Sequence, residues 1–221
     1  HGHGVEGLSD VAVLIAWIGG ITAFMAALIA FVQNDIKKVL AYSTMSQLAY
    51  IFTGLGVALW FYNHGEHHAA VIAFGASMFH LFNHAMAKGM LFMASGSVIH
   101  EMHHAHHHLA HGEGDHDDFD PQDMRNMGGL AGKMPITATA MAIGSASIIG
   151  LPLIGGFWSK EGIVAETWNA AALHGGTELL IPAFLILLTA GMTGFYMTRM
   201  WMMTFAGKPK TEFADHVEEQ T

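Results

Sequence analysis

The sequence predicts an all-α fold: a polytopic membrane helix bundle with about five transmembrane helices, one of which is interrupted. Apolar residues make up 52% of the chain and charged residues only 12%, about half the charged share of an ordinary soluble domain. The apolar residues also fall in blocks of about twenty or more, the length that an α-helix needs to cross a hydrocarbon core of roughly 30 Å. Both observations indicate a chain embedded in a membrane.

The first two blocks predict two helices joined by a short polar turn. Residues 11–31 carry no charge and are long enough to span a bilayer. Asp35 is the expected N-cap of a second helix over 36–60. Lys37 and Lys38 would lie in the first turn of that helix, where positive charge opposes the helix macrodipole, so their position calls for a reason.

The remaining blocks predict three more helices. Residues 69–99 are long enough to span with a tilt or to project from the bilayer. A fourth block starts after Pro135 and is interrupted by GLPLIGG at 150–156, which is typical of a helix broken inside a membrane. The fifth block covers 179–205. Because a broken helix frees backbone groups, protein or water must surround the break.

These elements divide the chain into five parts. They are an external lead-in over 1–10, transmembrane helices 1 to 3 over 11–99, a hydrophilic, His- and Asp-rich cytoplasmic loop over 100–134, helices 4 (broken) and 5 over 135–207, and a polar tail over 208–221. Most acidic residues lie in the loop and the tail, so the formal net charge of −9 describes these two segments and not the membrane blocks.

The basic residues predict the orientation of the chain. They occur in three connections: Lys37 and Lys38 between helices 1 and 2, Arg125 and Lys133 between helices 3 and 4, and Arg199, Lys208 and Lys210 at the end of helix 5. With five crossings these connections lie on one side, which the positive-inside rule makes cytoplasmic. We therefore expect a multi-pass protein of the cell (inner) membrane, with residue 1 outside and residue 221 in the cytoplasm.

The start of the chain and its lack of cysteine restrict the possible functions. The chain begins HGHGVEGLSD, without an initiator Met, a basic n-region or a cleavage site, so we expect a fragment and no signal peptide. Without cysteine there is no disulfide, no thiolate metal site and no cysteine-ligated iron–sulfur cluster. We therefore expect no electron transfer by this chain and no cofactor bound to it.

Three ionisable residues share one face of the third helix. The segment FHLFNHAMAKGMLF places His80, His84 and Lys88 at i, i+4 and i+8, and we call them the third-helix stripe. A lysine near the bilayer centre costs about 2.5–3.5 kcal/mol, so such residues usually face a bundle interior or water. Because histidine gains and loses a proton near neutral pH, the stripe predicts a proton relay. The alternative is a pair of core histidines that hydrogen-bond a neighbouring helix.

Lys160 and Glu161 form a second candidate site. They follow the GLPLIGG break, where an unwound segment leaves backbone groups free to bind ions and water. The alternative is a helix end at the interface with a snorkelling lysine. Lys37 is a third candidate, and its alternative role is that of a cytoplasmic topology signal.

The histidine-rich loop contains HEMHH, which matches the HExxH zinc-protease pattern at His100 and His104. The surrounding run is so rich in histidine that the match carries little information, and no convincing third ligand or partner motif for an intramembrane metalloprotease follows. We therefore predict no metal site, with His100 and His104 as a minor alternative for regulatory or adventitious metal. A solvated insertion is the default interpretation.

Four longer motifs carry a family resemblance. They are DIKKVLAYSTMSQLAYIFTGLG, FHLFNHAMAKGMLFMASGSVI, DMRNMGGL and LPLIGGFWSKEGI. Their order and spacing over 10–207 resemble the antiporter-like, proton-translocating subunits of respiratory complex I, most closely the NADH-quinone oxidoreductase subunit L, or mitochondrial subunit 5, type. The resemblance implies a larger core of two inverted five-helix repeats, of which this chain looks like the second.

The resemblance also implies roles for the candidate residues. Lys37 matches the family's lysine on the second helix of the repeat, and the third-helix stripe matches its central histidines and lysine. Lys160 matches the lysine of the broken helix on the exit route, and Glu161 takes the place of its acidic neighbour. The length of the histidine-rich loop departs from the family pattern, which leaves metal binding there as an open question.

The implied activity is proton translocation by a subunit of a redox-driven NADH–quinone or related oxidoreductase, an enzyme of the translocase class. FMN, iron–sulfur clusters and quinone would then belong to other parts of the complex. The implied partners are other membrane subunits, the lipid bilayer and protons, and not nucleic acid. Subunits of Mrp-type cation/proton antiporters and of membrane-bound hydrogenases share these motifs, and they are the alternative.

Overall fold

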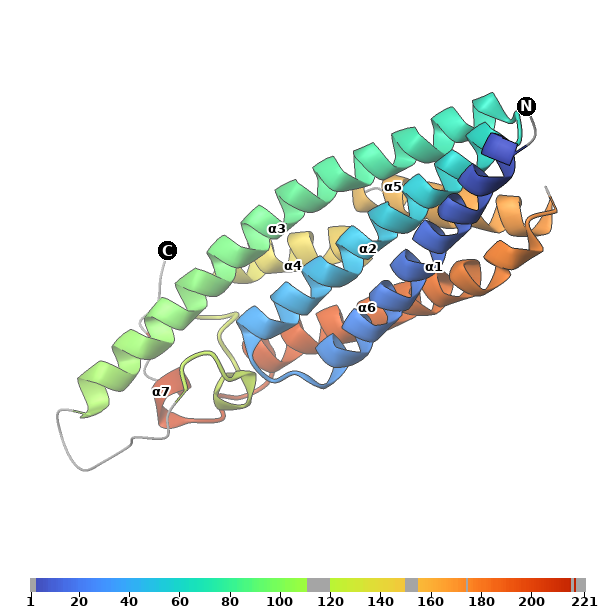
Figure 1. Ribbon diagram of the computed structural model, residues 1–221. Helices are drawn as coiled ribbons and strands as arrows, with labels where there is room; N and C mark the ends of the chain where they lie inside the picture. Colours follow the sequence, from blue (N-terminus) through green and yellow to red (C-terminus); the bar gives the residue numbers. More distant parts are fainter. Residues whose placement is uncertain (1–2, 111–119, 150–154, 174, 216, 218–221) are drawn as a thin grey trace.

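The computed structural model describes residues 3–110, 120–149, 155–173, 175–215 and 217. The described part is helical apart from turns, loops and one isolated β-bridge, as the sequence predicts, and forms an elongated bundle (Figure 1). Its elements in chain order are α1 (His3–Val32), α2 (Ile36–Asn63), α3 (His67–Ala110), η1 (Met124–Asn126), α4 (Pro135–Ile149), α5 (Gly155–Ala172), η2 (Thr177–Leu179), α6 (Leu180–Phe205) and α7 (Glu212–Asp215).

Four helices of the described part, α1, α2, α3 and α6, are long and apolar enough to cross a membrane. Helices α4 and α5 are shorter, and they follow one another along α3 (Figure 1). This arrangement fits a fifth crossing made of two half-helices. Residues 150–154 of the predicted break lie outside the described residues.

Two helix ends differ from the prediction. Helix α1 begins at His3 and not near Val11, so most of the predicted external lead-in is helical. Helix α3 continues to Ala110, so the segment predicted as a loop from His100 begins as helix. No glycine or proline occurs between Gly96 and Gly112 to stop it. A helix whose side chains are polar can leave the membrane and be solvated there.

Helices α1 and α2 pack closely because small residues line their contact. Buried alanines of α1, including Ala12 and Ala16, face α2 where it carries Gly56. A Cβ atom on Gly56 would lie 2.8 Å from the backbone nitrogen of Ala16 and 3.0 Å from the carbonyl oxygen of Ala12. Small residues of this kind allow membrane helices to approach until their backbones touch.

Polar contacts gather at one end of the bundle, where the turn between α1 and α2 meets α6 and the loop after α3. Asp35 caps α2 as predicted, accepting hydrogen bonds from the backbone nitrogens of Lys37 and Lys38. Arg199 of α6 donates to the carbonyl of Gln33 at 2.6 Å and to Asn34 Oδ1 at 2.7 Å. These bonds hold the start of α2 in place.

The loop before η1 closes on the same turn. The backbone nitrogen of Ile36 donates to the carbonyl of Gln122 at 3.0 Å, and that of Met124 donates to the carbonyl of Asn34 at 2.7 Å. Beside them the Arg125 guanidinium donates to the Asp123 carboxylate at 2.7 Å, which holds the pKa of that carboxyl below its usual value. The sequence motif DMRNMGGL thus belongs to a folded loop.

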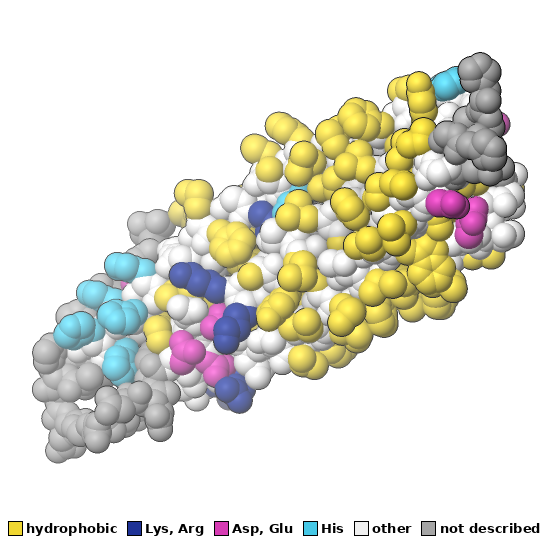
Figure 2. All heavy atoms as spheres, viewed as in Figure 1, with side chains coloured by type: hydrophobic (Ala, Val, Ile, Leu, Met, Phe, Trp, Pro, Cys, Tyr) yellow, Lys and Arg dark blue, Asp and Glu magenta, His cyan; other side chains and the backbone are white. Residues whose placement is uncertain are grey.

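Most basic residues of the chain gather at one end of the bundle. Seven of the nine lie in the connections and helix ends here, which we call the basic end: Lys37, Lys38, Arg125, Lys133, Arg199, Lys208 and Lys210. Figure 2 shows most of the visible Lys and Arg side chains toward this end, with hydrophobic side chains over much of the remaining face. The remaining two, Lys88 and Lys160, are buried in the bundle.

Replacing Gly56 by alanine should weaken the bundle by about 1–3 kcal/mol, because the new Cβ atom meets the backbone of α1. Gly75→Ala is the matched control: a Cβ atom added to this helical glycine would have nothing within 4 Å, so the change should be neutral or stabilise by up to about 1 kcal/mol. Thermal unfolding in detergent compares the two variants. Equal melting temperatures would contradict the close contact of α1 and α2.

Candidate functional site

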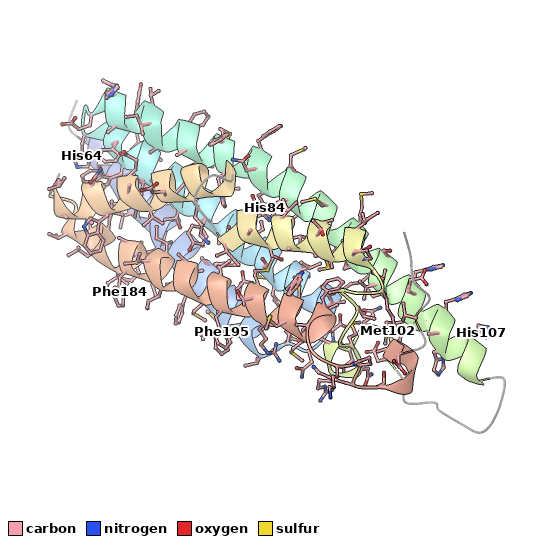
Figure 3. The ribbon with its side chains drawn as sticks, turned by 180° about the vertical axis from the view of Figure 1, so that it is seen from behind. His64, His84, Met102, His107, Phe184 and Phe195 are labelled. Atoms are coloured by element: carbon pink, nitrogen blue, oxygen red, sulfur yellow. The ribbon has the colours of Figure 1, made fainter. Side chains whose placement is uncertain are left out.

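The third-helix stripe is buried. His80, His84 and Lys88 are 2%, 6% and 5% exposed, although α3 also has a lipid-facing side with large exposed apolar residues. The rings of His80 and His84 lie 6.4 Å apart between centroids, and His84 lies midway along the helix (Figure 3). The predicted face therefore points into the bundle, where its groups are shielded from lipid.

Lys88 is held by the main chain of α2. Its Nζ donates to the carbonyl oxygen of Leu40 at 2.9 Å, and the same oxygen accepts a bond from the hydroxyl of Thr44. Leu40 lies one helical turn after Lys37, so this contact brings Lys88 to the basic end of α2. No carboxylate of the described residues forms an ion pair with Lys88.

His80 is held by a residue that the sequence motifs did not single out. Gln47 of α2 is fully buried, and its Oε1 accepts a hydrogen bond from His80 Nε2 at 3.0 Å. Gln47 Nε2 and His84 Nε2 are buried polar atoms with no hydrogen-bond partner among the described residues. Most buried polar atoms have a hydrogen-bond partner, so these two atoms are unusual and lie in a polar region of the interior.

Further buried polar side chains surround Gln47. Tyr196 of α6 is fully buried and donates to Ser43 Oγ at 3.2 Å, and Ser46 donates to the carbonyl of Ala23 at 3.1 Å. Ser43, Ser46 and Gln47 occupy one face of α2 at helical spacing. In an otherwise apolar chain, a run of three polar residues at this spacing is a signal that could have identified the face.

Lys160 continues the line of buried groups on α5. It is 5% exposed, and its Nζ lies 5.1 Å from the centroid of the Tyr50 ring. The Tyr50 ring lies in turn 6.1 Å from the His80 ring. We call Lys88, His84, His80, Tyr50 and Lys160 the buried row, because each neighbours the next across three helices.

Lys160 also meets the end of a helix. Its Nζ donates to the carbonyl oxygen of Ile148 at 3.2 Å, in the last described turn of α4. Carbonyls in the last turn of a helix lack intrahelical partners, and the dipole there favours a cation. The last described turn of α4 thus supplies an acceptor for the lysine on α5.

A groove opens beside Lys160. It has a volume of about 500 Å³ and runs between α5 and α6, with Glu161, Trp168 and Asn169 in its lining. Glu161 is exposed, unlike its neighbour Lys160. The structure therefore places one of these two candidate residues inside the bundle and the other at its surface.

The other predicted residues lie apart from the buried row. Lys37 is exposed in the first turn of α2. His100 and His104 are exposed on the part of α3 that continues beyond the predicted span, with rings 6.3 Å apart. No three or more potential ligands in the described part of the chain come close enough to hold a metal ion; residues 111–119 of the histidine-rich run lie outside it.

Comparison with known sequences identifies relatives. A family model described as NADH:quinone oxidoreductase/Mrp antiporter, TM, matches residues 7–189. The chain is 43% identical over 203 residues to NAD(P)H-quinone oxidoreductase chain 5 of Picosynechococcus sp. and 46% identical over 193 residues to the protein of that name from Synechocystis sp.. These matches cover 92% and 87% of this chain, but only 26% and 24% of the relatives. The chain thus spans about a quarter of their length.

Solved structures agree on the fold. A chain of the membrane-bound sulfane sulfur reductase, an archaeal respiratory membrane complex, superposes with a TM-score of 0.68 at 26% identity, covering 95% of this chain and 29% of that one. A chain of the Mrp complex from Dietzia sp. gives a TM-score of 0.65 at 22% identity, covering 90% and 32%. The family match, the identities and the helical bundle agree: this chain belongs to the NADH:quinone oxidoreductase/Mrp antiporter membrane family and resembles its subunit 5 or L type.

Proposed function

We propose that the chain moves protons across an energy-transducing membrane as a subunit of a redox-driven NADH–quinone or related oxidoreductase. The observation that carries the proposal is the buried row, in which two lysines and two histidines lie inside a membrane bundle. Ionisable residues in membrane helices are costly and usually serve transport. Names of relatives, which are NAD(P)H-quinone oxidoreductase chains, agree with this activity.

The row suggests an order of transfer. Protons would enter near Lys37 at the basic end, pass to Lys88 beside Leu40, and move along α3 through the two histidines. They would leave by Lys160, which borders the groove that also contains Glu161. Repulsion between neighbouring cationic sites would couple each transfer to the charge of the next site.

The same proposal includes an orientation. The positive-inside rule makes the basic end cytoplasmic, so residue 1 lies outside and residue 221 inside, in the cell (inner) membrane. Protons then move from the cytoplasm outward. Other membrane subunits would contact the chain, and subunits elsewhere in the complex would hold FMN, iron–sulfur clusters and quinone, since this chain has no cysteine to ligate a cluster.

A second candidate function is cation/proton exchange by an Mrp-type antiporter or transport by a membrane-bound hydrogenase subunit. The family description itself names the Mrp antiporter. An antiporter moves protons in exchange for Na⁺ or K⁺ without redox input. Proton flux in proteoliposomes that requires Na⁺ and no electron donor would support this candidate over the first.

Lys160→Ala should lower proton pumping by roughly a hundredfold, the effect expected for loss of a positioned proton donor. Pumping is measured as acidification by membrane vesicles that contain the complete complex, with oxidoreductase activity followed in parallel. Lys210→Ala, at an exposed position of the basic end, serves as the control and should pump normally. Unchanged pumping and coupled activity in Lys160→Ala would show that the assignment is wrong.

Gln47→Leu should reduce pumping roughly tenfold, because it removes the side-chain oxygen that accepts the hydrogen bond from the buried His80 Nε2. Gln47→Glu keeps an acceptor oxygen at that place and should retain more activity. Gln122→Leu, in the loop at the basic end, is the control. If Gln47→Leu and Gln122→Leu pumped equally well, the contact between α2 and His80 would have no part in the pathway.

A further inference from the structure

The surroundings of Lys160 raise a question about its charged form. A buried ammonium normally has a carboxylate partner, yet no carboxylate in the described part of the chain forms an ion pair with Lys160. Its Nζ donates a hydrogen bond to the carbonyl of Ile148 and lies over one aromatic face, that of Tyr50 at 5.1 Å. Within the described part of the chain, these two contacts favour the charged form.

The Tyr50 ring is fixed in its place. It is fully buried, and its hydroxyl donates to the carbonyl oxygen of Ile186 on α6 at 2.6 Å. This bond ties α2 to α6 and keeps the ring from turning out of the row. The ring face, and not the hydroxyl, is consequently what Tyr50 offers to Lys160.

The Tyr50 ring also lies between the histidines of α3 and Lys160 of α5. The His80 ring lies 6.1 Å from the Tyr50 ring centroid, and Lys160 Nζ lies 5.1 Å from it. A proton that moves from the histidines to Lys160 therefore passes beside Tyr50. Among the described residues, the groups near Lys160 are Tyr50 from α2, His80 from α3 and the Ile148 carbonyl from α4, with Glu161 next to it on α5 and apolar Leu187 and Ala190 from α6.

We propose that Tyr50 is a positioning residue that holds the protonated form of Lys160 against the face of its aromatic ring. The attraction between a cation and a ring quadrupole acts on the ammonium and not on the neutral amine, and it is stronger where water is excluded. It is weaker than a buried ion pair, so Lys160 can still release its proton. This inference rests on the proposed proton pathway and deepens it.

The test is a series of fluorinated phenylalanines at position 50 in the complete complex. Each fluorine withdraws charge from the ring face and weakens its attraction for a cation, while the ring keeps nearly the same size. The measured quantity is the pH at which proton pumping falls to half its maximum as the pH is raised and Lys160 loses its proton. From phenylalanine to trifluorophenylalanine this midpoint should move to lower pH in steps, by about half a unit to one unit in total.

Three controls make the result decisive. Tyr50→Phe keeps the ring and removes the bond to Ile186, so it provides the reference for the series. The same fluorinated residues at Phe61, which is fully buried and packs against Trp60, should leave the midpoint unchanged. Tyr50→Leu should shift the midpoint at least as far as the trifluorinated ring, and if it fails to assemble, the fluorinated series decides alone.

Lys160→Ala is assayed beside the series to separate the two proposals. If it pumps normally, the proposed pathway is wrong. If it stops pumping but the midpoint is the same for every ring at position 50, the pathway stands and the role of Tyr50 is wrong. A midpoint that differs between Leu and Phe but not along the fluorinated series would show a packing role only, and would also overturn the inference.

Discussion

A lysine inside a membrane bundle must find acceptors for its ammonium group, and this requirement governs how the helices of the chain are arranged. Lys88 and Lys160 both reach main-chain carbonyls, those of Leu40 and Ile148. Main-chain acceptors are set by helix position and helix ends, so the helices themselves must be placed to within a hydrogen bond's length. A carbonyl carries only a partial charge, and it therefore leaves the lysine free to change its protonation state.

Helix α2 supplies most of these partners. In the most apolar 18-residue stretch of α2, 67% of the residues are buried, against 28–39% in the corresponding stretches of α1, α3 and α6. Helix α2 is therefore the central helix of the described bundle. One face of α2 carries Leu40, Gln47 and Tyr50, which meet Lys88, His80 and Lys160 in that order. The close contact of α1 with Gly56 and the bonds from Arg199 to the preceding turn hold this helix from two sides.

The helical periodicity of the sequence was sufficient to predict much of this arrangement. The apolar blocks predicted the four long helices, and Asp35 was correctly predicted as the N-cap of α2. The four-residue spacing predicted that His80, His84 and Lys88 share one face, and all three are buried. These features depend on neighbours along the chain. Helix α3 continues past the predicted span to Ala110 because polar composition alone does not end a helix, and no glycine or proline lies between Gly96 and Ala110.

The contacts between helices could not be predicted in the same way. The polar spacing on α2 could mark the face that carries Gln47, but not its partner His80, and Tyr50 looks like an ordinary helix residue until Ile186 and Lys160 are seen beside it. The exposure of Lys37 and Glu161 likewise depends on which helices pack beside them. The roles of these residues in transport stay predictions, and so does the structure of the predicted break at 150–154.

The continuity of α3 sets the distance between the ionisable groups of the third-helix stripe. An α-helix rises about 1.5 Å per residue, so groups four residues apart are separated by about 6 Å, in agreement with the 6.4 Å between the rings of His80 and His84. A hydrogen bond spans only about 3 Å. In the proposed pathway the unbroken helix is therefore a spacer that keeps the rings of His80 and His84 out of direct contact. In the proposed pathway a proton would cross each gap only when a side chain turns or a water molecule enters, so the backbone geometry would limit proton leakage at rest.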